Sequence, residues 1–159
     1  MSGIFSTAGA VVYIGNPTAA KSTDFVTADF SSHSFVAIGW LENIGQFGDE
    51  SPEVTFAAIG EGRMQKLKGV RDAGTMNLVC GIDHTDEGQA NLRIAQRTAS
   101  NYSFKVEFND EAVGGQPSTR TFIAMVMSVR EQLDTANSVA KLNAALAINS
   151  NIVVVDAVP

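Results

Sequence analysis

RMQKLKGVRDAGTMNLVCGIDHTDEGQANL, residues 63–92, joins a basic loop, a glycine-containing turn, an alternating strand and a capped helix. Apolar and polar residues alternate over 75–82, as expected for a strand with one buried face. Asp86 and Gln89 then have the spacing of a capping box at the start of a helix. The stretch contains no plausible set of catalytic groups, so it favours an architectural role over an enzymatic one.

Short apolar runs bounded by turn residues predict a mainly β protein on both sides of this stretch. The expected strands cover residues 10–14, 35–41, 54–59, 75–82, 102–108, 122–129 and 152–155. Residues 139–148 have the Ala and Leu content of a helix but alternate like a strand, and residues 23–30 predict one or two helical turns. The predicted fold is a β-sandwich or partly closed barrel of roughly eight strands with one flanking α-helix.

The patterns also predict which faces are buried. In 102–108 the aromatic and aliphatic residues face the core, and Ser103, Lys105 and Glu107 face water. Residues 122–129, FIAMVMSV, are apolar on both faces, so this strand lies between two layers or is covered by another subunit. The expected buried face of the helix consists of Gly88, Leu92, Ala95 and Ala99.

Length and charge restrict the class of protein. A chain of 159 residues with 45% hydrophobic residues can form one domain with a sizeable core. Seventeen acidic against eleven basic residues give a net charge of −6, which argues against a phosphate-gripping surface. One cysteine fits a reducing compartment, and neither a secretory signal nor a bilayer-spanning apolar run is expected. We therefore expect a soluble protein with no membrane partner.

Nucleophilic chemistry could draw only on Cys80, His33 and His84. Cys80 shares the apolar face of its strand, so we predict a core residue rather than an exposed, activated thiolate. His84 lies among carboxylates in Asp83–Asp86, but no further His or Cys cluster supplies the remaining ligands of a zinc site. We read that segment as a strand-to-helix turn and expect no metal, no cofactor and no catalytic residue.

Two glycine-containing segments are expected to be turns. Gly60-Glu61-Gly62 lacks the third glycine and the following helix of a phosphate-binding loop. Gly114-Gly115 is read as the tip of a loop between two strands.

Four of the eleven basic residues gather in one segment, at Arg63, Lys66, Lys68 and Arg71. The cluster lacks the aromatic residues that nucleic-acid surfaces interleave with their bases. It is either a solvated hairpin or loop, or a cationic arm that contacts an acidic neighbour. The acidic residues available for that contact are Asp49, Glu50 and Glu53, or Asp83, Asp86 and Glu87.

Several motifs follow one another in a characteristic order. They are LENIGQFGD (41–49), RMQKLKG (63–69), DAGT (72–75), DEGQ (86–89), YSFK (102–105) and MVMSVR (125–130). Together they cover most of the chain from about residue 35 onward, and their order resembles that of bacteriophage major tail tube proteins of the long, non-contractile type. That family is related to the tube proteins of contractile tails and of type VI secretion.

The resemblance implies a single tail-tube domain over residues 1–159, with 139–148 as a strand. In the family, subunits form rings, usually hexameric, which stack into a hollow tube through which DNA passes during ejection. It implies as partners further copies of the chain, a tape measure protein, and tail terminator and tail tip proteins. DNA would be a transient cargo. The protein would be located in the virion tail, after assembly in the cytoplasm of a bacterial host.

Other functions stay open from the residues alone. The chain could be a tube subunit of a secretion system or of a gene transfer particle, which sequence does not separate from a phage tail. It could also be a monomeric β-sandwich that binds a small molecule or glycan at surface aromatic residues, or an enzyme that uses His84 with nearby carboxylates.

Overall fold

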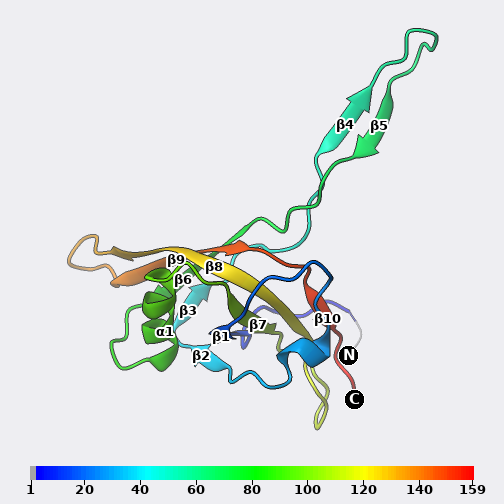
Figure 1. The fold of residues 1–159 in the computed structure, drawn as a ribbon. Coiled ribbons are helices and arrows are strands. Elements are labelled where there is room, and N and C mark those ends of the chain that lie inside the picture. The colour runs from blue at the N-terminus through cyan, green and yellow to red at the C-terminus, as the bar shows by residue number, and fades with distance from the viewer. Residues whose placement is uncertain (1–2) are drawn as a thin grey trace.

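A computed structural model describes residues 3–159 as a mainly β body from which a long hairpin projects (Figure 1). The strands of the body are β1 (Val11–Pro17), β2 (Val36–Ile38), β3 (Leu41–Asn43), β6 (Thr75–Gly81), β7 (Tyr102–Glu107), β8 (Thr119–Gln132), β9 (Lys141–Ile148) and β10 (Val153–Val155). A 3₁₀ turn η1 (Thr27–Phe30) and one helix α1 (Glu87–Gln96) accompany them. The predicted class, mainly β with one flanking helix, is confirmed.

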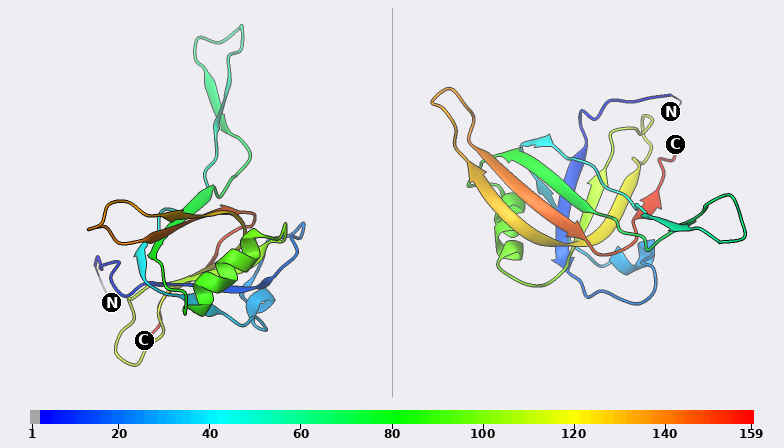
Figure 2. Two further views of the ribbon diagram at one scale, coloured as in Figure 1. Left: turned by 90° about the vertical axis from the view of Figure 1, so that its left-hand side faces the viewer. Right: turned by 90° about the horizontal axis from the view of Figure 1, so that it is seen from above.

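One eight-stranded antiparallel sheet forms the body, in the order β2-β1-β7-β8-β9-β6-β3, with β10 paired to β8. Its two edge strands, β2 and β3, are neighbours in sequence, separated by Gly39 and Trp40. The sheet therefore curls until its edges meet at a corner, without closing into a barrel (Figure 2). The single strand expected over 35–41 is wrong: the chain breaks at Trp40, whose φ of 57° is incompatible with extended backbone.

The main core lies inside this curled sheet. Met76, Leu78 and Cys80 of β6 point inward, as the alternation predicted, and pair with the alternating residues of β9. Residues 141–148 thus form a strand despite their helical propensity, because β6 and β8 both hydrogen-bond to them. The strand implied by the family resemblance is confirmed.

A second, smaller apolar cluster covers the other face of β8. Ile123 packs there against Phe25, Phe30 and Val153, so the chain itself supplies the second layer over this part of the strand. Farther along β8, Met127 stays exposed. The same layer corrects the prediction for Ser103, which is fully buried and accepts a hydrogen bond from the Asn16 N–H at 3.0 Å instead of facing water.

The helix α1 packs against β8, β2 and β1. Asp86 caps it, because the carboxylate accepts a hydrogen bond from the Gln89 N–H at 3.0 Å. Gly88 is required where the helix meets β2, since a Cβ there would collide with the Ala37 carbonyl. The helix ends at Gln96, so the prediction that Ala99 belongs to its buried face is wrong.

Candidate interaction surfaces

The projecting hairpin, residues 50–72, is called the arm here. Two backbone hydrogen bonds between Glu50 and Asp72, of 2.7 and 2.8 Å, close its base. Beyond them β4 (Glu53–Phe56) pairs with β5 (Gln65–Lys68) in a separate two-stranded sheet. Both figures show the arm extending away from the body (Figures 1 and 2). The strand expected over 54–59 ends at Phe56, and part of the predicted basic loop is the strand β5 of this hairpin. Its contact with an acidic neighbour stays a prediction.

The pairing register gives the arm an apolar face and a charged face. Val54 pairs with Leu67, which places these two side chains beside Phe56 on one face. Val54 is 47% exposed, Phe56 62% and Leu67 63%, because the body of the chain does not cover them. A two-stranded hairpin is at best marginally stable alone in water. The exposed apolar face of this hairpin is therefore a candidate contact surface.

The predicted charged residues fall into two groups. Glu53, Lys66 and Lys68 share the other face of the arm, where Lys66 Nζ lies 3.9 Å from Glu53 Oε2. Arg63 lies between the arm tip and β5. Because exposed ion pairs contribute little stability, the Lys66–Glu53 pair leaves both charges available to a neighbour.

The second group lies at the base of the arm. Asp49 and Arg71 line a hollow of about 340 Å³ together with Asp24 and Asp72. Glu50 lies beside them in the bridge to Asp72. The structure therefore separates the expected acidic set, with Glu53 on the arm itself and Asp49 and Glu50 where the arm leaves the body.

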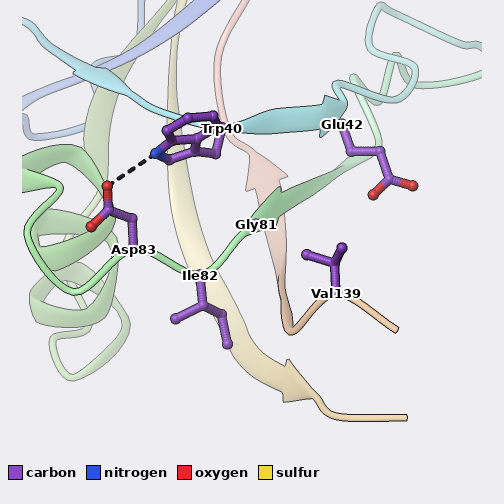
Figure 3. A pocket seen from close by; sticks show the side chains of 6 residues that line it. All are labelled: Trp40, Glu42, Gly81, Ile82, Asp83 and Val139. Atoms are coloured by element: carbon purple, nitrogen blue, oxygen red, sulfur yellow. Dashed lines mark hydrogen bonds between the residues drawn. The ribbon is translucent and has the colours of Figure 1, made fainter. Parts of the chain in front are cut away.

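A third surface surrounds the corner between β2 and β3. Trp40 is 72% exposed there and borders a hollow of about 430 Å³ (Figure 3). The hollow, called the Trp40 corner here, is lined by Trp40, Glu42, Gly81, Ile82, Asp83 and Val139. The indole Nε1 donates a hydrogen bond to Asp83 Oδ2 at 3.0 Å, and Glu42 Oε1 accepts one from Lys141 Nζ at 3.0 Å.

The buried side chain of Gln89 forms hydrogen bonds with the backbone of this corner. It is 2% exposed; Oε1 accepts from the Asp83 N–H at 3.0 Å, and Nε2 donates to the carbonyls of Gly39 at 3.2 Å and Gly81 at 2.8 Å. The predicted capping box is therefore half correct: Asp86 caps the helix, but the Gln89 amide reaches Asp83 and not Asp86. One buried amide ties α1, the corner and the end of β6 together.

Asp83 is held as a carboxylate at this corner. Hydrogen bonds from the Thr85 hydroxyl, the Thr85 N–H and the Trp40 indole lower its pKa below the usual range. The sequence predicts Asp83 as a turn residue and as one of the acidic residues available to a cationic arm, but it does not single out Trp40. The available signal was a solitary tryptophan directly after a glycine, within an apolar run.

The residues considered for chemistry lie apart. Cys80 is 1% exposed inside the core, whereas His84 is exposed in the turn before α1. His33 Nδ1 lies 2.8 Å from the buried Ser103 Oγ. Within residues 3–159, no group of three or more His, Cys, Asp and Glu side chains is placed to hold a metal ion. Over the same residues, no helix has the length and apolar character needed to cross a membrane.

Cys80 should resist alkylation in the folded protein. Burial raises the pKa of its thiol to about 11, so the nucleophilic thiolate is scarce at neutral pH and sterically protected. We expect iodoacetamide to label Cys80 only after denaturation, as followed by intact mass. Rapid labelling of the native protein at pH 7 would contradict the buried position.

No protein-family model and no curated protein sequence matches the chain. Solved structures do match it. A chain of the anti-feeding prophage baseplate superposes with a TM-score of 0.70 at 15% identity, covering 98% of both chains. The sheath/tube terminator of the extracellular contractile injection system PVC gives 0.68 at 11% identity, covering 97% of this chain and 98% of the other.

The SPP1 tail tube protein gives a TM-score of 0.60 at 12% identity, over 91% of this chain and 76% of its own. These likenesses extend over nearly the whole chain, including the curled sheet and the flanking helix. At identities this low, the structural likeness establishes a common architecture. This is the architecture that the ordered motifs indicated. The chain therefore has the fold shared by these phage-tail and contractile-injection-system proteins.

Proposed function

We propose that this chain is a structural, non-enzymatic subunit of a phage-type tail tube, forming a single tail-tube domain over residues 1–159. The observation that carries the proposal is the arm, a long hairpin whose apolar face the body of its own chain leaves uncovered. A hairpin of this kind is marginally stable alone, and a partner that covers its apolar face would stabilise it. A second copy of the chain is the partner that a tube requires.

In this proposal, subunits form hexameric rings that stack into a hollow tube. The baseplate structure with the same fold is six-fold symmetrised, which supports that ring size. Head-to-tail contacts between copies close into rings in one direction and extend as filaments in the other. We assign the contacts between subunits or rings to Arg63, Lys66, Lys68, Arg71, Asp49, Glu50 and Glu53.

The tube would conduct DNA during ejection. A subunit with a net charge of −6 repels phosphates on average, so DNA would slide through the tube without adhering to it. A tape measure protein, tail terminator and tail tip proteins would complete the tail, in a virion assembled in the bacterial cytoplasm. A secretion-system or gene-transfer tube remains the alternative, favoured by the likeness to contractile injection systems.

Electron microscopy of the purified protein tests this function directly. We expect rings or tubes in negative stain as the protein concentration rises. Monomers alone, at high concentration and over a range of salt, would contradict the proposal. They would favour the alternative of a monomeric β-sandwich ligand-binding module.

Reversing two charges on the arm should weaken assembly and leave the body folded. Lys66→Glu with Lys68→Glu places three carboxylates on one face of the hairpin, with Glu53, and reverses the charge shown to a neighbour. We expect half-maximal assembly, measured by light scattering, to need at least about tenfold more protein.

A third substitution separates the two effects of this reversal. Adding Glu53→Lys restores opposite charges within the hairpin and keeps the pattern facing the neighbour reversed. Assembly should stay weak in this triple variant if the charges act between subunits. Full recovery would show that they act only within the arm, and unchanged assembly of the double variant would remove them from the contact altogether.

A further inference from the structure

We propose that the Trp40 corner of one subunit receives the apolar face of the arm of a second copy of this chain. The inference rests on the proposed self-assembly and goes beyond it, because it assigns the surface that accepts the arm. No part of residues 3–159 covers either surface, and the two have complementary chemistry.

Trp40 is held outward by the fold. Its φ of 57° is costly for a residue with a side chain, and such conformations persist where the surrounding structure imposes them. The Asp83 carboxylate fixes the indole through Nε1, and Gln89 fixes the preceding carbonyl of Gly39. The large ring is thus pre-ordered on the surface, which lowers the entropy lost on binding. Tryptophan is among the side chains that contribute most to interfaces.

The surroundings of Trp40 form an apolar hollow with an acidic rim. Val139, which is exposed, and the half-buried Ile82 lie across from the indole (Figure 3). Asp83 stands at the rim, together with Glu42, which is paired with Lys141. Such a site fits the apolar face of a segment whose remaining surface is positively charged.

The arm has that composition. Val54, Phe56 and Leu67 form its apolar face, while Lys66 and Lys68 project from the same strands on the other face. Arg63 adds a further base between the tip and β5. The apolar side chains would enter the hollow, while Lys66 and Lys68 on the opposite face would stay in solvent. Their longer-range attraction to the carboxylates at the rim would steer the approach of the arm.

The positions of the two surfaces require that the arm come from another copy. α1, β2 and β3 lie together at one end of the body, whereas the arm projects away from that end (Figures 1 and 2). A donor and an acceptor on different sides of one subunit make a head-to-tail contact, which repeats from copy to copy. This is the kind of contact that builds a ring or a tube.

The single tryptophan of the chain makes the contact measurable in the wild-type protein. On assembly, the emission of Trp40 should shift to shorter wavelength and its quenching by acrylamide should fall. Trp40→Ala should raise the protein concentration needed for assembly about 30-fold. Val113→Ala, at an exposed residue in the turn before β8, is the matched control and should assemble as the wild type does.

A disulfide between two copies tests the identity of the occupant. Val139→Cys borders the hollow, and Gln65→Cys lies on the apolar face of the arm beside Phe56. The two variants are mixed, assembled and oxidised, and we expect a cross-linked dimer. Val113→Cys mixed with Gln65→Cys should give none. The buried Cys80 should not compete.

The outcomes separate this inference from the proposed function. If the wild-type protein never forms rings or tubes, the proposed function fails and the inference fails with it. If tubes form but Trp40 remains as quenchable as in the unassembled chain, the inference alone is overturned. It is also overturned if Trp40 becomes shielded without the Val139–Gln65 cross-link, since another segment would then cover the corner.

Discussion

Replacing Val54, Phe56 and Leu67 together with serine should raise the concentration needed for assembly at least about 100-fold. These three residues form one face of the arm, and the body of their own chain leaves them exposed. Truncating a hot-spot residue at the centre of an interface costs about 2 kcal/mol or more, which is roughly 30-fold in affinity, so one hot spot with a weaker neighbour accounts for this loss. Electron microscopy and sedimentation of the triple variant would measure the loss.

The body of the triple variant should stay folded. Substitutions at exposed sites usually change stability by less than about 0.5 kcal/mol, so thermal unfolding of the unassembled protein should be nearly unchanged. Serine replacement of Ile94, Val113 and Val158, which are also more than half exposed but lie on the body, is the control. We expect that control to assemble normally.

Shortening the arm provides an independent version of the same experiment. The Glu50–Asp72 bridge closes the base of the arm, so residues 52–70 can be replaced by a short glycine turn without disturbing β6. This variant should remain monomeric. If the serine variant and the shortened variant both assembled at wild-type concentration, the arm would have no part in assembly.

Gln89→Leu should lower the free energy of unfolding by roughly 3 kcal/mol, since three backbone groups lose a buried partner. For a chain of this size that loss corresponds to a melting temperature about 6–12 °C lower. Leucine fills a similar volume but cannot form hydrogen bonds, so the effect isolates the amide. Calorimetry of unassembled protein is the appropriate measurement, because assembly would add its own stabilisation.

The same substitution at an exposed site of the helix serves as the control for Gln89. Gln96→Leu leaves helix propensity similar and touches no buried group, so its melting temperature should stay close to that of the wild type. Gln89→Leu should also change the fluorescence of Trp40, because the carbonyl of the preceding residue, Gly39, loses its hydrogen bond to the helix. An unchanged melting temperature would show that water or a rearranged neighbour replaces the amide.

The sequence reveals local geometry well in this protein. Alternation places Met76, Leu78 and Cys80 in the core, and the Asp86 cap marks the start of the helix, because both signals depend on residues only a few positions apart. The ordered motifs also indicated the fold. The strand break at Trp40 was not predicted, because the apolar run continues past it to Leu41 and only Gly39 marks the position.

The interaction surfaces were only partly predictable. The basic segment around Lys66 and Lys68 stands out in the sequence, and its hairpin form was one of two readings. The pairing of Val54 with Leu67, which creates an apolar face, depends on the register between two strands. The Trp40 corner joins residues from β3, the turn after β6 and the segment before β9, so no local pattern marks it.

The sequence by itself determined the mainly β class, the capped helix, the buried cysteine and a basic segment available for contacts. Tertiary structure alone decided that Ser103 is buried, that Gln89 ties three elements together, and that Trp40 faces outward. The physical reason is the range of the interactions. Periodicity and capping act within a few residues, whereas burial and hydrogen bonding of these side chains depend on segments that approach each other only after the sheet has curled.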